Sequence, residues 1–295
     1  MLKHILPLIP KHSVYTEAFC GGAAVLFAKQ PVASEVINDI NMELVNFYWC
    51  CQMYYGDLKA EIDRTLHCRD IHAHAAHINA YPQFFTPVQR AWAVWMLSKS
   101  SFASKLDGSF GYDFHGGMSK KLRNAKDSFT EELCRRLEHV TIENRDALTV
   151  IRTYDRPEAF HFVDPPYINS NCGPYSGTFN EQDLHGLLQL LETVSGKFML
   201  TMFPHEDIES EADRNGWVIH RVERSITASK TTRRRQEEWM VCNYEIPETW
   251  SGGGYNRYSK LQIISDISKH LIIIFYEQVS SNFEQDSPGR KGSGE

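Results

Sequence analysis

Residues 14–29, with the sequence VYTEAFCGGAAVLFAK, decide the fold of this chain. The first six residues predict a short buried strand, and the last seven have good helix propensity. Gly21 and Gly22 stand between the two elements, where glycine lets the backbone approach a ligand at the helix N-terminus. Strand, glycine turn and helix in this order predict the opening of a nucleotide-binding α/β unit.

The next strand agrees with this prediction, because the run VIND at residues 36–39 ends in an acid, Asp39. Nucleotide-binding units place such an acid about 20 residues after the glycine turn, where it holds ribose hydroxyls. The full G-x-G-x-x-G pattern of dinucleotide binders is absent, which argues against NAD or FAD. The chain also has no G-x-x-x-x-G-K-[ST] run, so an NTPase phosphate loop is not expected.

A further buried strand, AFHFV at residues 159–163, runs into the tetrapeptide DPPY at 164–167. Each proline fixes its own φ and disfavours helix for the residue before it, so a stiff, extended bend is expected at the carboxyl edge of the sheet. The ring of Tyr167 and acceptors from Asp164 and the Pro165 carbonyl can bracket a planar group that carries an NH2. An adenine rotated out of a duplex is such a group.

These elements, in this order, resemble the Dam-type (alpha-group) adenine-N6 DNA methyltransferases. EAFCGG at 17–22 is similar to their S-adenosylmethionine motif, NDIN at 38–41 to their ribose-binding acid, and DPPY to their catalytic motif. ENRDA at 143–147 resembles the segment before the catalytic strand, whose acid lies near the cofactor adenine. EWMVCNY at 238–244 resembles the last core strand. The resemblance covers about residues 1–247.

The resemblance implies an α/β fold with a Rossmann-like, S-adenosylmethionine-dependent methyltransferase core. We expect this core at residues 1–54 and 137–249, with a mainly helical DNA target-recognition domain inserted at 55–136. A linker and a partly disordered tail are expected at 250–295. Within these parts the patterns predict helices at 57–79, 87–98 and 181–194, with Asn180 as an N-cap, and strands at 197–201, 216–224 and 238–245. Trp92 and Trp95 are expected in a core.

The implied activity is site-specific transfer of a methyl group from S-adenosylmethionine to the N6 amine of a flipped adenine in duplex DNA. No metal is needed, because the sulfonium of the donor already activates the methyl group. The resemblance assigns catalysis to Asp164, Pro165, Pro166 and Tyr167. It assigns cofactor binding to Glu17, Phe19, Cys20, Gly21, Gly22, Asp39, Ile40, Asp146, Ala147 and Asp164.

Charge is distributed unevenly along the chain. The net charge is −6, but residues 221–235 carry six basic and one acidic side chain, and residues 99–136 carry eight basic and five acidic ones. Local positive charge can direct a polyanion to one face of an acidic protein. The alternative is that such runs are merely solvated surface. The candidate DNA-binding residues are Lys105, Ser109, Tyr112, Arg233, Arg234 and Arg235.

Other patterns bear on compartment and metal binding. No secretory signal and no apolar run near 18 residues is evident, and the seven cysteines are scattered, which predicts a cytoplasmic protein with reduced thiols and no membrane partner. The group His67, Cys68, His72, His74 and His77 has spacings unlike those of zinc sites, so a polar helix face is expected there.

Three questions stay open at the level of sequence. The same chemistry on RNA or protein glutamine is an alternative, although Asp rather than Asn or Ser at position 164 favours adenine. A DNA-binding protein with impaired catalysis is another, because the given chain starts with MLKHILP and does not include the aromatic-x-Gly-Gly-Lys segment that family members carry before the first helix. We therefore expect weaker cofactor binding. A cognate restriction endonuclease is a candidate partner, beside double-stranded DNA.

Overall fold

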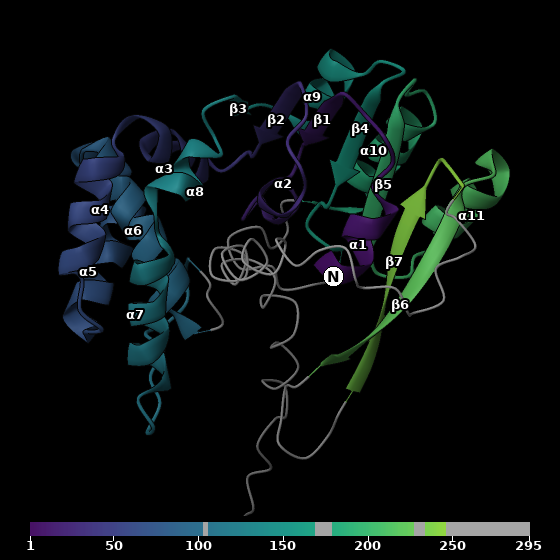
Figure 1. Cartoon of the computed structure of the whole chain (residues 1–295). Coiled ribbons are helices and arrows are strands. Elements are labelled where there is room, and N and C mark those ends of the chain that lie inside the picture. Colours follow the sequence, from purple (N-terminus) through teal and green to yellow (C-terminus); the bar gives the residue numbers. More distant parts are fainter. Residues whose placement is uncertain (103–105, 169–178, 227–233, 246–295) are drawn as a thin grey trace, which may run out of the picture.

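Seven strands form one mixed sheet in the computed structural model, with helices against both faces (Figure 1). The structure describes residues 1–102, 106–168, 179–226 and 234–245, so the tail expected at 250–295 lies outside it. The α/β class is confirmed. The strands are β1 (Val14–Glu17), β2 (Ser34–Asn38), β3 (Val140–Glu143), β4 (Ala159–Val163), β5 (Lys197–Met202), β6 (Val218–Ile226) and β7 (Arg234–Cys242).

The strand order is β3-β2-β1-β4-β5-β7-β6. Strands β1 to β5 are parallel, whereas β7 is antiparallel to both β5 and β6. From β1 the order reverses, with β2 and β3 on one side and β4 and β5 on the other. Open α/β sheets bind ligands at the carboxyl ends of the strands at such a reversal. The glycine turn after β1 and the DPPY tetrapeptide after β4 therefore both lie where a ligand is expected.

Helices cover both faces because side chains alternate along each strand. Phe160 and Phe162 of β4 pack in one apolar cluster, and Val163 packs in another. The first cluster includes side chains of α1 (Leu2–Ile5), α2 (Ala24–Ala28) and α3 (Met42–Met53), and the 3-10 turn η1 (Leu6–Leu8) follows α1. The second includes side chains of α9 (Ala147–Tyr154), α10 (Glu181–Leu191) and α11 (Glu206–Asn215).

The N-cap predicted for the helix after residue 180 is confirmed. The Asn180 side chain accepts hydrogen bonds from the backbone N–H groups of Gln182 (2.8 Å) and Asp183 (3.3 Å). Asp183 in turn accepts from the Asn180 N–H at 2.9 Å, which completes a capping box. The helix α10 ends at Leu191, three residues before the predicted end.

Between α3 and β3 the chain is helical, and these helices lie beside the β3 edge of the sheet (Figure 1). Helix α6 is at their centre, with every residue from Ala91 to Ser100 buried, including Trp92 and Trp95 as expected. A helix that is buried all round must be surrounded by other elements, and α6 contacts α3, α4, α5 and α7. The helices here are α4 (Tyr55–Arg64), α5 (Arg69–Ala80), α6 (Pro87–Ser100), α7 (Gly117–Ser128) and α8 (Glu131–Arg135), with the 3-10 turn η2 (Pro82–Phe84) between α5 and α6.

The prediction of one continuous helix at 57–79 was wrong. The structure contains two helices there, α4 and α5, which are separated by a turn at residues 65–68. Thr65 explains the break. Its hydroxyl donates to the Glu61 carbonyl at 2.8 Å and accepts from the Trp92 indole N–H at 2.7 Å. The turn therefore satisfies the buried indole, and both helices pack against α6.

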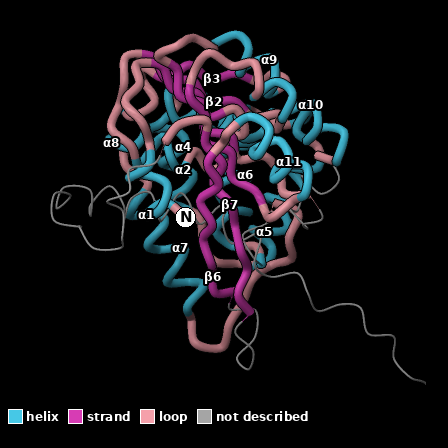
Figure 2. Tube along the Cα trace, turned by 90° about the vertical axis from the view of Figure 1, so that its right-hand side faces the viewer, coloured by secondary structure: helices cyan, strands magenta, loops and turns pink. Residues whose placement is uncertain are grey.

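The strands predicted at 216–224 and 238–245 are present as the antiparallel pair β6 and β7, which extends beyond the other strands (Figures 1 and 2). Both bounds differ from the prediction. Gly216 ends α11 in the left-handed conformation, with φ of 67°, so β6 starts only at Val218. Strand β7 starts earlier than predicted, and its residues 234–238 pair with β6 alone because the pairing with β5 begins at Trp239.

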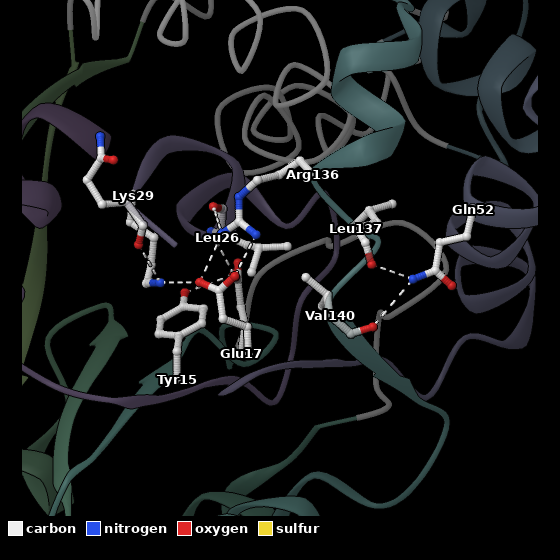
Figure 3. A network of polar contacts seen from close by, with 10 residues as sticks. Tyr15, Glu17, Leu26, Lys29, Gln52, Arg136, Leu137 and Val140 are labelled. Carbon is white, nitrogen blue, oxygen red and sulfur yellow. Dashed lines mark hydrogen bonds and ion pairs between the residues drawn. The ribbon is translucent and has the colours of Figure 1, made fainter. Parts of the chain in front are cut away.

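A buried polar network joins the helical segment to the sheet (Figure 3). The Glu35 carboxylate of β2 forms ion pairs with Lys29 and with Arg136, which follows α8. Arg136 also donates to the Leu26 carbonyl at 3.0 Å. The burial of a charge costs several kcal/mol unless it is paired. These contacts therefore fix the position at which the chain returns from its helices to β3.

We predict that Arg136→Met lowers the free energy of unfolding by about 3 kcal/mol, because it leaves buried Glu35 with one cationic partner in place of two. The neighbouring Arg135→Met is the matched control, since Arg135 pairs with Glu131 in solvent. This control should lose no more than about 0.5 kcal/mol. Urea unfolding of both variants measures the difference. Equal losses would show that the buried network does not stabilise this junction.

Candidate active site

The carboxyl ends of β1 and β4 bring the two sequence motifs together. Glu17, the last residue of β1, pairs with Phe162, the next-to-last residue of β4. The glycine turn at residues 18–23 and the DPPY bend at 164–167 consequently leave the sheet side by side. This is the reversal point of the strand order, where open α/β sheets bind ligands.

The glycine turn is tight and buried. Gly21 has φ of 46°, which favours glycine, and Ala23 adopts the same left-handed region with φ of 48°. The Cys20 N–H donates to the Asn38 carbonyl at 2.8 Å, and the Tyr48 hydroxyl donates to the Gly21 carbonyl at 2.5 Å. A left-handed alanine costs about 1–2 kcal/mol, so these contacts must hold the turn in place.

Glu17 supplies the cap that helix α2 lacks. Ala23, the N-cap residue of α2, has no side chain that accepts a hydrogen bond. The Glu17 carboxyl, which is buried, accepts instead from the Leu26 backbone N–H at 3.0 Å and from the Tyr15 hydroxyl at 2.9 Å (Figure 3). The structure thus gives Glu17 a structural role beneath the turn, and its predicted contact with the cofactor stays a prediction.

Asp39 holds the same turn from the end of β2. One of its carboxylate oxygens accepts from the Gly21 N–H at 2.9 Å, and the other accepts from the Asn41 N–H at 2.8 Å. The adjacent Ile40 leaves 66% of its surface exposed, which is unusual for a large apolar side chain next to a sheet. The predicted acid and the predicted apolar contact therefore lie together at the tip of β2, beside the glycine turn.

The remaining predicted cofactor residues surround this edge. Asp146 is exposed and caps α9, since its carboxylate accepts from the Thr149 N–H at 2.8 Å and the Thr149 hydroxyl at 2.9 Å. Ala147 is buried at the first position of that helix. Phe19 is half-buried, and its ring packs edge-on against Phe179 at a centroid distance of 5.9 Å.

The DPPY tetrapeptide is positioned by the strands next to β4. The Thr201 hydroxyl of β5 donates to the half-buried Asp164 carboxylate at 2.5 Å. The Tyr167 ring packs edge-on against Phe203 at a centroid distance of 4.6 Å, and its hydroxyl donates to Glu238 of β7 at 2.6 Å. Pro165 is buried, whereas Pro166 is half-buried.

Three residues that support this site had no role in the sequence interpretation: Asn38, Thr201 and Glu238. Each is polar and buried in a strand whose neighbouring side chains are largely apolar. A buried polar residue in such a strand is the informative observation, because it requires a partner. Asn38 and Glu238 stand in recognised motifs and Thr201 stands in a predicted strand, but their partners lie up to 107 residues away in the chain, and only the fold shows them.

The candidate DNA contacts are only partly described. Lys105 and Arg233 lie outside the described residues, and Arg234 and Arg235 are placed only as backbone at the start of β7. Ser109 and Tyr112 are exposed in the segment between α6 and α7. The guanidinium of Arg69 lies 5.7 Å from the centroid of the Tyr112 ring.

Three of the histidines considered as metal ligands contact side chains of neighbouring segments. His72 is buried and within 2.8 Å of the Ser101 hydroxyl, while His74 and His77 both pack against Phe85. Within the described part of the chain, a different group brings three possible ligand atoms together: Glu181, His205 and Asp207. These residues lie at the starts of α10 and α11, and Nε2 of His205 lies 3.0 Å from a carboxylate oxygen of Glu181.

Comparison with known families agrees with the geometry. Residues 1–214 match the family described as D12 class N6 adenine-specific DNA methyltransferase. The chain belongs to this family. It is thus an adenine-specific DNA methyltransferase that modifies the N6 amine, and its reaction requires a methyl donor. A search of curated proteins gave no significant match. Among the described helices, none has the length and apolar character needed to cross a membrane.

The buried carboxyl of Glu17 beneath the glycine turn makes the stability of the protein depend on pH. Burial raises the pKa of the Glu17 carboxyl from 4.5 to about 8, and the charge of Asp164 adds to the rise, while the hydrogen bonds from Tyr15 and Leu26 oppose it. Between pH 4.5 and about pH 8, Glu17 keeps its proton in the folded protein, whereas it has released that proton in the unfolded chain. The stabilising effect of this proton is complete below pH 4.5 and is lost as the pH rises through about 8.

We predict that Glu17→Gln, which cannot ionise, becomes more stable relative to the wild type as the pH rises. From about pH 5 to pH 9, the difference in unfolding free energy should change by on the order of a few kcal/mol. Urea unfolding across this range measures it. Glu138→Gln, at an exposed position, is the control and should follow the wild-type curve. Parallel curves for the wild type and Glu17→Gln would contradict a proton held at this site.

Proposed function

We propose that this enzyme transfers a methyl group from S-adenosylmethionine to an adenine that is rotated out of duplex DNA at a specific sequence. The observation that carries the proposal is the meeting of the glycine turn and the DPPY bend at one reversal point of the sheet. A donor bound at the first would face an amine held at the second. The family supports the reaction, and the positions of these two segments support the roles of the residues.

The residues at the β1 and β2 ends fit the adenosine part of such a donor. Each carboxylate oxygen has two lone pairs, so Asp39 can accept from ribose hydroxyls while it retains its bonds to Gly21 and Asn41. The exposed side chain of Ile40 offers an apolar surface for a purine ring. Because Asp39 also fixes the Gly21 turn, its loss is expected to disturb the whole of this half of the site.

The DPPY bend fits the target amine. The lone pair of the adenine amine is delocalised into the ring, which makes it a poor nucleophile. Hydrogen bonds from the amine to the Asp164 carboxylate and the Pro165 carbonyl would localise this lone pair and stabilise the positive charge that develops on nitrogen. The bond from Thr201 keeps the carboxylate in one orientation for this purpose. The Tyr167 ring would stack on the extruded base.

The transfer then requires only correct placement. A bound S-adenosylmethionine would supply a methyl group on a sulfonium. As the amine nitrogen bonded to that carbon, the C–S bond would break and its electron pair would stay on sulfur. The amine proton becomes acidic once nitrogen is methylated and leaves toward Asp164 or solvent. Such an in-line displacement depends mainly on holding the two reactants at the correct distance and angle.

Contacts with DNA are proposed from two directions. The ends of β6 and β7 at Ile226 and Arg234 project past the carboxyl edge of the sheet, and the sequence around and between these ends, residues 221–235, is basic. The helical segment 55–136 lies on the other side of the sheet in Figure 1 and carries Lys105, Ser109 and Tyr112. We assign phosphate contacts to Arg233, Arg234 and Arg235, and recognition of the target sequence to the helical segment.

The experiment that tests the reaction is transfer of tritiated methyl from S-adenosylmethionine to unmethylated genomic DNA, followed by nucleoside analysis. We expect the label in N6-methyladenine. Label in N4-methylcytosine, in RNA or in protein would contradict the proposal.

Two variants separate the roles within the site. Asp164→Ala should abolish transfer but keep the affinity for S-adenosylhomocysteine, because Asp164 acts on the target amine. Asp39→Ala should weaken that affinity by about tenfold or more, since a ribose hydroxyl loses a charged acceptor. Calorimetry of both variants is the measurement. If the two variants bound S-adenosylhomocysteine equally poorly, this division of roles would be wrong.

The DNA assignment has its own test. Reversal of charge at Arg233, Arg234 and Arg235 should weaken binding to all sequences similarly and reduce the salt slope by up to about 3, as lost phosphate contacts do. The same change at exposed Arg152, Arg156 and Arg214 is the control, because these residues lie near the amino ends of the strands. Fluorescence titrations at several salt concentrations give the slopes. If the salt slope of the variant at Arg233, Arg234 and Arg235 is unchanged, the basic run is solvated surface that does not contact phosphate.

A further inference from the structure

We propose that Glu238 is a positioning residue for the reaction and that it acts by holding the hydroxyl of Tyr167. This inference rests on the proposed role of the DPPY bend. The Glu238 carboxyl, only 1% exposed, accepts a hydrogen bond from the Tyr167 hydroxyl at 2.6 Å. The two residues are 71 positions apart in the chain, so the contact is a product of the fold.

The register of the sheet places Glu238 at the catalytic edge. Trp239 pairs with Met202, the last residue of β5, so Glu238 lies one residue beyond the end of β5. At that point the chain continues from β5 into Phe203, whose ring packs against Tyr167 at 4.6 Å. Tyr167 is thereby held at two places, at the ring edge by Phe203 and at the hydroxyl by Glu238.

A glutamate is out of place at this position unless it has such a function. Glu238 alternates with Met240 and Cys242 along β7, and both of those residues are fully buried in the apolar core. Its partner across the pair is Val222 of β6, which is also buried. An apolar side chain would fit this series, and a buried carboxyl is costly without partners. Packing alone therefore does not explain Glu238.

The effect on the reaction follows from the geometry of tyrosine. Its side chain has two rotatable bonds, so a fixed hydroxyl and a fixed ring edge leave one orientation of the ring plane. A base that stacks on this ring then has a defined plane, three residues from the carboxylate that receives its amine. Glu238 never touches the base in this scheme. Its loss should slow methyl transfer without a change in donor binding.

The test uses the full-length enzyme and four variants: Glu238→Gln, Glu238→Leu, Tyr167→Phe, and the double variant Tyr167→Phe with Glu238→Leu. Glutamine retains an acceptor oxygen, and phenylalanine removes only the hydroxyl, so these two changes avoid a cavity. The neighbouring Glu237→Gln is the control, because Glu237 is half-exposed and lies on the other face of β7.

Single-turnover methyl transfer to unmethylated DNA and the affinity for S-adenosylhomocysteine are measured for each. We expect Tyr167→Phe and Glu238→Leu each to slow the transfer step by about tenfold, because each change removes the same hydrogen bond. The double variant should be no slower than either single variant, and Glu238→Gln and Glu237→Gln should stay within about twofold of the wild type. Donor affinity should not change in any of them.

Three outcomes would overturn the proposal: a wild-type transfer rate for Tyr167→Phe, a transfer rate for Glu238→Gln as slow as that for Glu238→Leu, or rate losses that multiply in the double variant.

A further measurement excludes a merely structural role for Glu238. Once sequencing of methylated DNA has located the target adenine, 2-aminopurine at that position reports the extruded base by its fluorescence. Glu238→Leu should alter this signal, and Glu237→Gln should not. A failure of the proposed function itself can be recognised separately. If the wild-type enzyme leaves no label in N6-methyladenine, that function is refuted, whatever the variants do.

Discussion

The side chain of Asn38 holds together the chain segments at the carboxyl ends of β1, β2 and β3. Its amide group donates to the Ala18 carbonyl at 2.8 Å and to the Arg145 carbonyl at 3.0 Å, and its oxygen accepts from the Arg145 N–H at 2.9 Å. These partners follow β1 and β3, while Asn38 itself ends β2. One buried side chain thus satisfies backbone groups at the ends of three adjacent strands. The glycine turn and Asp39 can take fixed positions because the chain on both sides of them is tied in this way.

The helical segment is joined to the sheet at both of its ends by a similar use of buried hydrogen bonds. Gln52 of α3 donates to the Leu137 carbonyl at 2.5 Å, next to Arg136 and its pairing with Glu35 (Figure 3). The chain therefore leaves the sheet and returns to it at neighbouring points. An arrangement with close ends lets a large segment be inserted without a change in the strands around it.

Sequence reasoning found the parts of this structure that depend on local chemistry. The glycine turn, the DPPY bend and the Asn180 cap are short patterns, each with its own physical reason, and the α/β class followed from their order. What it did not find depends on distant contacts. The break at Thr65 requires the indole of Trp92, and the pairing of Glu35 with Arg136 joins residues 101 positions apart. A pattern within one window contains no information on such partners, because the fold alone brings them together.

The antiparallel strand β7 explains how the C-terminal part of the core contributes to the site. In a sheet of parallel strands alone, the residues at the carboxyl edge are those at which each strand ends. Because β7 runs in the opposite direction, its first residues lie at that edge, and Glu238 reaches Tyr167 there. Because β6 and β7 pair with each other beyond Met202, the last residue of β5, the two strands extend past the carboxyl edge of the sheet on the side where Asp164 lies. The direction of β7 therefore places a buried carboxyl from the C-terminal part of the core against the aromatic ring of the DPPY bend.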